Sequence, residues 1–361
     1  MNEAQKKIRV AVLPIAGKED PTQMLMMQAV EASGRFELKH GVHARFFAAT
    51  RSYFKLKPDL FYFDWITRYH AGRNIFVTWL KLAAFWLDVK IVTQVFRRPI
   101  VWSLHNLHSH ERTTAAEARE RAVQRFFARR ATLIRVFSQG TVARTAALLE
   151  VNAVKLRVVP VGNYINYYRN EISPSTARTR LGLAHDDFVL LWLGSIRPYK
   201  GLHELLEAFR LVAKSNWRLV VAGRPYIEDY AREIAVLAQS DSRIQLHFRF
   251  IPLDELQVYY NAADAVALPF VEVENTSSLV VAMGFRKPIV APDLGIIGER
   301  LCHQRELVYA PGELITGLKT LAGLSTVRRS EIGAANFEEA SRHDWSDLAP
   351  VLAEAVNLSL A

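Results

Sequence analysis

Two cations lie between two glycines in a short stretch that reads LGSIRPYKG and ends at Gly201. Gly194 lets the chain turn closely, and Arg197 and Lys200 supply positive charge. The stretch follows an apolar run and precedes a helical pattern. A helix start with paired cations suits a diphosphate. We therefore predict a phosphate-binding loop, with a solvated basic turn as the alternative.

A second polar stretch, within the sequence LPFVEVENTSS, precedes an apolar helical pattern. Asn275, Thr276 and Ser277 are residue types that cap helices, and the free N–H groups of a helix start bind phosphate. Glu272 and Glu274 are suited to accept hydrogen bonds from sugar hydroxyls. The alternative is an ordinary helix cap with exposed acids.

A third stretch, HNLHSHE, follows the apolar run at residues 100–104. Histidine titrates near neutral pH and therefore suits a general base. His110 and Glu111 are the candidate bases here. Asp64 is a further candidate, because it ends the strand-like run LFYFD and is expected at the same edge of a sheet.

The remaining polar residues of this stretch are His105, Asn106 and His108, which we expect to contact the second substrate. A structural polar loop and a metal site remain open as alternatives. The histidine spacings of three and two match no recognised zinc pattern, and the chain has no Asp-x-Asp, no Walker loop and no dinucleotide glycine fingerprint. We expect no cofactor and no metal.

All of these stretches follow short apolar runs that alternate with helical patterns. The runs are Ile8–Ile15, Leu60–Phe63, Ile100–Leu104, Leu133–Phe137 and Leu156–Val161, then Phe188–Leu193, Leu219–Ala222, Ile244–Phe248, Ala265–Leu268 and Ile289–Ala291. Apolar strands between helices imply parallel sheets covered on both faces, which bind ligands beyond the carboxyl ends of their strands. The predicted fold class is α/β, with two doubly wound, Rossmann-like domains facing a cleft.

The chain has 361 residues, which favours two domains because single cores rarely grow past about 250–300 residues. Residues 162–187 are polar and weakly periodic, and are expected to form a linker with one short helix. The predicted domains span 1–165 and 166–340. A last helix in 341–361 is expected to pack back toward the first domain.

Net charge, cysteine content and the N-terminal residues indicate the partners and the compartment of the protein. The net charge of +10 attracts acidic partners, namely nucleic acid, anionic lipid or phosphorylated substrates. One cysteine permits no intramolecular disulfide and fits a reducing compartment. The short N-terminal apolar run has no cleavage site after it, so we expect a cytoplasmic protein.

Two segments of the first domain suggest a membrane surface. Residues 75–96 are apolar and aromatic, but Lys81 and Asp88 interrupt them, so we predict a partly exposed amphipathic helix whose polar side includes Thr78. Eight arginines and two acids lie between Arg112 and Arg144. Together these segments predict peripheral attachment to an anionic membrane, with a core helix and a solvated helix face as the alternatives.

The three polar stretches, in this order, resemble those of GT-B glycosyltransferases. GSIRPYKG resembles the phosphate loop of their second domain, and YYNAADAVALPF with SSLVVAMGFRKPIVAP resembles their donor-site helix and the following strand. Within the fold, LHNL..HE, IRPYKG and NTSSL resemble bacterial exopolysaccharide β-mannosyltransferases of the xanthan type. The resemblance covers nearly all of the second domain and, more weakly, the first.

This resemblance implies the activity and the partners. The family inverts the sugar configuration, uses GDP-mannose and acts on a polyprenyl-diphosphate-linked sugar. The first domain would bind the acceptor and the second the nucleotide sugar, with Gly194, Gly223 and Phe250 near the nucleotide and sugar. The protein would lie at the inner face of a membrane and bind no nucleic acid.

Two positions depart from the large retaining family of this fold. That family has a Gly-Arg pair in the phosphate loop, where this chain has Gly194 followed by Ser195. It also has a second glutamate that binds ribose, at a position that corresponds to Val281. These departures favour the inverting pattern. The alternatives are a retaining UDP-sugar transferase and a non-catalytic basic protein that binds nucleic acid or membrane.

Overall fold

The computed structural model describes residues 6–17, 21–105 and 114–360. The chain divides into two compact units, Met1–Gly162 with Asp344–Ala361, and Asn163–His343. The expected boundaries at 165 and 340 lie within three residues of these. The last helix, α15 (Ala349–Leu360), belongs to the first unit, where its Glu354 accepts a hydrogen bond of 2.8 Å from Arg157 Nε.

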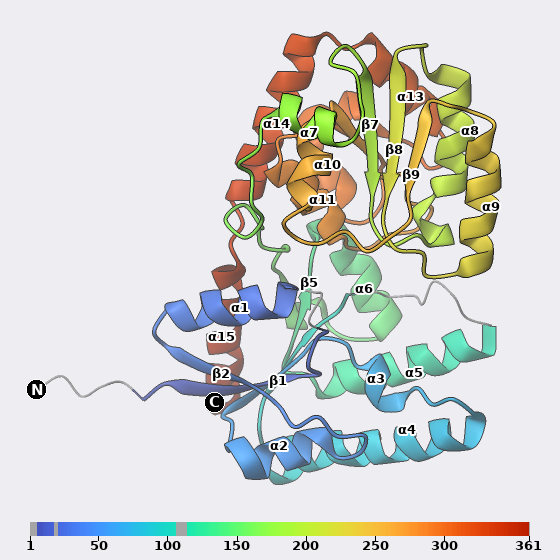
Figure 1. Cartoon of the computed structure of the whole chain (residues 1–361). Helices are drawn as coiled ribbons and strands as arrows, with labels where there is room; N and C mark the ends of the chain where they lie inside the picture. The colour runs from blue at the N-terminus through green and yellow to red at the C-terminus, as the bar shows by residue number, and fades with distance from the viewer. Residues whose placement is uncertain (1–5, 18–20, 106–113, 361) are drawn as a thin grey trace, which may run out of the picture. The chain divides into compact units, whose positions relative to one another are not determined.

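The first unit is a six-stranded parallel sheet in the order β2-β1-β3-β4-β5-β6, surrounded by helices (Figure 1). Its strands are β1 (Ile8–Leu13), β2 (Phe36–His40), β3 (Leu60–Phe63), β4 (Ile100–Ser103), β5 (Leu133–Val136) and β6 (Leu156–Val158). Its main helices, besides α15, are α1 (Thr22–Ala32), α2 (Ala48–Leu56), α3 (Thr67–His70), α4 (Ile75–Lys90), α5 (Thr114–Arg130) and α6 (Val142–Leu149). The strand order reverses direction between β1 and β3.

The second unit is another six-stranded parallel sheet, in the order β12-β11-β10-β7-β8-β9. Its strands are β7 (Phe188–Leu193), β8 (Trp217–Ala222), β9 (Ile244–His247), β10 (Ala265–Ala267), β11 (Ile289–Pro292) and β12 (Val308–Tyr309). Its helices are α7 (Pro174–Arg180), α8 (Leu202–Val212), α9 (Glu228–Gln239), α10 (Leu256–Ala262), α11 (Ser277–Gly284), α12 (Ile297–Arg300), α13 (Leu314–Gly323) and α14 (Thr326–Ser341). The order reverses between β7 and β10, as in a dinucleotide-binding Rossmann sheet.

The two sheets confirm the predicted fold class, and all ten predicted runs contain a strand. Both strands without a prediction, β2 and β12, lie at sheet edges. β2 reads FELKH and is exposed at its end, and β12 has two residues, so neither carries an apolar run. α8 turns an apolar face to the core, because Leu202, Leu206 and Phe209 are fully buried.

The prediction for α4 is wrong about which face is exposed. Thr78 and Asp88 are each only 4% exposed. The Asp88 carboxylate accepts hydrogen bonds from the N–H groups of Ala49 (2.9 Å) and Thr50 (2.7 Å), at the start of α2. Burial raises the pKa of Asp88, although these hydrogen bonds oppose the shift. The charged side of the helix therefore faces the protein, because it caps a neighbouring helix.

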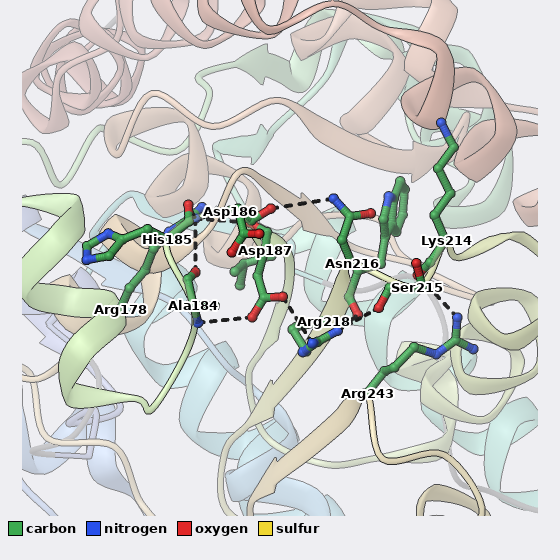
Figure 2. Close-up of polar contacts among 12 residues, drawn as sticks. Arg178, Ala184, His185, Asp186, Asp187, Lys214, Ser215, Asn216, Arg218 and Arg243 are labelled. Atoms are coloured by element: carbon green, nitrogen blue, oxygen red, sulfur yellow. Dashed lines mark hydrogen bonds and ion pairs between the residues drawn. The ribbon is translucent and has the colours of Figure 1, made fainter.

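The amino edge of the second sheet is a closed polar network (Figure 2). Buried Arg178 donates to the carboxylate of Asp264 (2.7 Å) and to the carbonyls of His185 (2.6 Å) and Asp187 (2.9 Å). Arg218 pairs with Asp187 at 3.1 Å. Arg243 donates to Asp241 through Nε at 2.9 Å and through Nη2 at 2.7 Å. At this edge the cations therefore have both carboxylate and carbonyl partners.

Candidate functional site

Two of the predicted stretches meet at the carboxyl edge of the second sheet. β7 and β10 are hydrogen-bonded neighbours at the reversal of strand order, and the stretches at 194–201 and 268–278 follow them. The N–H of Val271 donates to the carbonyl of Tyr199 at 2.9 Å, which joins the two loops. Ligands of such sheets bind at this reversal, beyond the strand ends.

Glycines allow three backbone segments to approach one another here. A Cβ on Gly223 would lie 1.8 Å from the Gly194 carbonyl oxygen. Gly201, the N-cap residue of α8, has a φ of +68°, and a Cβ there would lie 1.8 Å from the Pro269 carbonyl oxygen. Larger side chains would push these loops apart, so both glycines are needed for the close packing. Gly194 and Gly223 were predicted site residues, and they are in contact.

Lys200 places its ammonium group over this backbone. A Cβ built on Gly194 would lie 2.8 Å from Lys200 Nζ and 3.9 Å from Ser278 Oγ. Lys200 keeps some solvent exposure, and no other described residue gives its ammonium group a hydrogen bond or ion pair. Burial, with a smaller contribution from Arg197, lowers the pKa of Lys200 from 10.5 to about 8. This cation is suited to an anionic ligand.

Arg197 lies against an aromatic ring at the same edge. Its guanidinium carbon is 3.4 Å from the centroid of the Tyr226 ring, which fixes the plane of the guanidinium group. The loop is held to its neighbour by hydrogen bonds from Ile196 N to Arg224 O (3.0 Å) and from Tyr226 N to Ile196 O (3.2 Å). Phe250, which follows β9, is 45% exposed and presents a further aromatic surface at this edge.

The start of α11 completes this side of the site. Thr276 caps the helix and accepts a hydrogen bond of 3.2 Å from Ser278 N, while Ser277 is its first residue. The side-chain oxygen of Asn275 is buried, and no donor among the described residues reaches it. A buried oxygen without a donor costs free energy, which a hydrogen-bond donor of a bound ligand would offset.

The preceding loop carries the two predicted acids, Glu272 and Glu274, both partly buried. The carbonyl of Glu274 accepts a hydrogen bond of 3.1 Å from Ile296 N. Gly295, with a φ of +53°, allows that contact, because a Cβ there would lie 2.6 Å from the same oxygen. The backbone of the acidic loop is thus fixed beside α11.

A second polar cluster lies at the carboxyl edge of the first sheet, where its own strand order reverses. The buried carboxylate of Asp64 accepts a hydrogen bond of 2.7 Å from Gln23 Nε2 and lies 3.2 Å from His105 Nε2. The imidazole ring of His105 stacks on Trp65 with centroids 4.4 Å apart. A carboxylate on one nitrogen and a stacked ring fix the orientation of this histidine.

No pattern in the sequence pointed to Gln23 or Trp65. Gln23 lies on α1 and also donates to the carbonyl of Pro14 at 2.9 Å, so it links the helix, β1 and Asp64. Its partner is 41 residues away along the chain, and an isolated glutamine near a helix start indicates nothing by itself. The contact between Gln23 and Asp64 appears only in the folded chain.

Several predicted residues lie outside the described parts of the chain. They are Asn106, His108, His110 and Glu111. Within the described parts, no group of three or more His, Cys, Asp or Glu side chains is placed to hold a metal ion. None of the helices described is long and apolar enough to cross a membrane.

Comparison with known sequences identifies the second unit. Residues 187–322 match the family model described as glycosyl transferases group 1. GDP-mannose:glycolipid 4-beta-D-mannosyltransferase of Xanthomonas campestris is 27% identical over 258 residues, which are 70% of this chain and 66% of that protein. Lipopolysaccharide 1,2-N-acetylglucosaminetransferase of Salmonella typhimurium is 30% identical over 157 residues, 41% of each chain. The chain thus spans about two thirds or less of these relatives.

Comparison with solved structures identifies the fold over the whole chain. Anabaena Alr3699/HepE in complex with UDP and glucose has a TM-score of 0.72 at 20% identity, covering 97% of this chain and 100% of that one. Sucrose-phosphate synthase from Thermosynechococcus elongatus has a TM-score of 0.74 at 14% identity, covering 98% and 99%. The chain therefore has the GT-B fold over nearly its whole length, and its second unit carries a domain that matches the glycosyl transferases group 1.

Proposed function

We propose that this protein is a glycosyltransferase that binds the diphosphate of a nucleotide sugar at the carboxyl edge of its second sheet. The observation that carries the proposal is the ammonium group of Lys200, which lies beside Gly194 and has no counter-ion among the residues that the structure describes. A partly desolvated cation next to a helix start and a glycine turn matches the charge and shape of a diphosphate. Arg197, Asn275, Thr276 and Ser277 lie in the same two loops, which the hydrogen bond from Val271 to Tyr199 joins.

The donor that the comparisons favour is GDP-mannose. Among the similar proteins, the Xanthomonas relatives are named for that donor and for a glycolipid acceptor. The competing donor is a UDP-sugar, because a neighbour of the same fold was solved with UDP-glucose. Glu272 and Glu274 would accept hydrogen bonds from the sugar, and the Phe250 ring would lie against the nucleotide.

We infer an inverting, metal-independent reaction. The acceptor oxygen forms a bond to the anomeric carbon while the bond from that carbon to the diphosphate oxygen breaks. Lys200, Arg197 and the N–H groups at the start of α11 stabilise the negative charge that develops on the leaving diphosphate. The proton of the acceptor hydroxyl passes to a base of the first unit. Candidates are Asp64, in its pair with His105, and His110 or Glu111.

The acceptor that fits this scheme is a lipid-linked saccharide in the assembly of an exopolysaccharide or related glycan. Such an acceptor stays in the membrane, while the nucleotide sugar diffuses through the cytoplasm. We therefore place the protein at the inner face of a membrane as a peripheral protein. His105, Asn106 and His108 would contact the acceptor.

A donor screen with two site variants tests this function. GDP-mannose, UDP-glucose and UDP-N-acetylglucosamine are compared by thermal shift, because a bound ligand raises the melting temperature. Transfer or hydrolysis of the best donor is then measured. Lys200→Ala and Arg197→Ala should each lower kcat/KM about tenfold or more, the loss expected for one charge-assisted contact.

Matched controls are Lys214→Ala, an exposed cation before β8 at the opposite edge, and Arg232→Ala, an exposed cation of α9 that pairs with Asp229. Both should retain the kcat/KM of the unmodified protein. If no nucleotide sugar raises the melting temperature, or if the site variants react like the controls, the proposed function is wrong. The anomeric configuration of the product separates the inverting from the retaining reaction.

A further inference from the structure

The outward face of α4 is apolar along its whole length. Its exposed side chains are Ile75, Phe76, Trp79, Leu80, Trp86 and Leu87, with exposed fractions between 43% and 75%. They recur at the spacing of one helix face. An exposed stripe of this size on one helix is unusual for a surface that meets only water and marks an interaction site.

The helix cannot turn this face inward. On its opposite side, Leu82, Phe85 and Val89 are buried in the core of the first unit. Asp88 caps the start of α2, and the Lys81 ammonium group donates to the carbonyl of Arg68 at 2.7 Å. Rotation would expose the core residues and break these contacts. The polar groups of α4 are therefore used inside the protein, and the apolar stripe is left outside.

The charges around the stripe indicate which partner covers it. Arg73 and Lys90 are exposed at the two ends of the helix, and Arg97 is exposed just beyond it. The only acidic residue from 73 to 98 is Asp88, which is buried. An apolar face between cations, with no exposed acid, complements the hydrocarbon and the negative headgroups of an anionic bilayer.

We propose that α4 lies in the plane of an anionic lipid bilayer, with the stripe below the headgroups and Arg73 and Lys90 at headgroup level. Tryptophan is enriched at this depth in membrane proteins, and Trp79 is 60% exposed. At 1.5 Å per residue, the 16 residues of α4 span about 24 Å along the surface. This proposal deepens the proposed function by naming the protein surface that contacts the membrane. It rests on the proposed function only for the reason why the protein would attach to a membrane.

Vesicle binding by the whole chain tests the stripe. Phe76→Ser with Trp79→Ser should lower the partition coefficient onto phosphatidylcholine–phosphatidylglycerol vesicles at least about tenfold, because two inserted rings are lost. The matched control is Leu211→Ser with Val236→Ser, which removes two exposed apolar side chains of the second unit. This control should bind as the unmodified chain does.

A second pair of variants tests the cations. Arg73→Gln with Lys90→Gln should weaken binding to the anionic vesicles several-fold, and high salt should remove that difference because it screens exposed charges. The control, Lys214→Gln with Lys319→Gln, removes two exposed lysines of the second unit and should bind within about twofold of the unmodified chain. Wild-type levels of binding by the Arg73–Lys90 variant would contradict the placement at the headgroups.

Trp79→Phe provides a test that leaves the stripe apolar and the fold intact. Brominated lipids should quench the fluorescence of the unmodified chain more strongly than that of this variant. The proposal is overturned if the chain ignores anionic vesicles at low salt, if quenching is equal, or if the stripe variants abolish self-association instead of vesicle binding. Nucleotide-sugar binding is measured in vesicle-free buffer, so failure of the membrane surface and failure of the proposed function are distinguishable.

Discussion

The positive charges at the two edges of the second sheet have opposite surroundings. At the amino edge, Arg178 donates to the carboxylate of Asp264 and to the carbonyls of Ala262, His185 and Asp187. At the carboxyl edge, Lys200 has no such partner among the described residues, and its pKa is lowered to about 8. The same sheet therefore holds a paired cation at one end and an unpaired one at the other.

The difference is the one expected between a charge that stabilises the fold and a charge that binds a ligand. Burial of a charge costs free energy, and Arg178 recovers that cost through its hydrogen bonds. Lys200 does not recover it in the free protein, so its site is less stable than the fold could make it. Such a cost is retained where a ligand later supplies the missing negative charge. The comparison therefore predicts opposite effects of neutralising the two residues.

The largest effect is expected at the paired edge. Arg178→Met should lower the free energy of unfolding by about 3 kcal/mol, because it leaves the partly buried Asp264 without its cation and the carbonyls of His185 and Asp187 without this donor. Denaturant unfolding measures this change. Donor affinity of the folded variant should stay the same, since the residue lies at the opposite edge from Gly194. A stability loss below about 1 kcal/mol would mean that the network at this edge contributes little.

Lys200→Met should do the reverse. Its affinity for the nucleoside diphosphate should fall about tenfold or more, while the melting temperature of the free protein rises by a few degrees. The folded chain releases this proton more readily than the unfolded chain does, so the stability gain is largest below pH 8 and disappears toward pH 10. Calorimetry with and without the diphosphate measures both quantities. Destabilisation together with unchanged affinity would make Lys200 a structural cation.

A smaller effect is expected from pH alone. Lys200 is protonated below about pH 8 in the free protein, and only the protonated form attracts the diphosphate. Affinity should therefore fall about tenfold between pH 7.5 and pH 9.5. Titration calorimetry over that range measures the profile. Lys200→Arg keeps its charge throughout and is the control, so an equally steep profile in that variant would assign the titration to another group.

Both sites were partly visible in the sequence. Gly194, Gly201 and Lys200 could be found because the loop that joins a strand to a helix is local, and its glycines mark the close backbone contacts. The desolvation of Lys200 could not be found, because it depends on Ser278 and the rest of the second unit. Asp64 was found from its place at a strand end, whereas Gln23 was missed because its partner is distant in sequence.

The distinction between local and distant signals also explains which strands and which helix face could be predicted. Central strands are apolar on both faces and were predicted, while the edge strands β2 and β12 are short or half-polar and were missed. The exposed face of α4 was mispredicted because Asp88 and Thr78 are polar residue types. The burial of Asp88 depends on Ala49 and Thr50, about 40 residues earlier, which no helical periodicity contains.

The smallest effect is expected from a chelator, which should change neither donor affinity nor transfer. The positive charge at the carboxyl edge comes from Lys200, Arg197 and the start of α11, and in the proposed reaction these groups would stabilise the diphosphate in place of a divalent ion. Activity assays with EDTA, with and without added Mg²⁺, measure this. Activity that is lost in EDTA and restored by Mg²⁺ would contradict the prediction. Glu272→Gln with Glu274→Gln would then test whether those acids hold the ion, since that variant should no longer respond to Mg²⁺. An unpaired lysine and a bound cation would compete for the same phosphate oxygens. The comparison of the two edges therefore requires that the protein is active in EDTA and that this activity depends on Lys200.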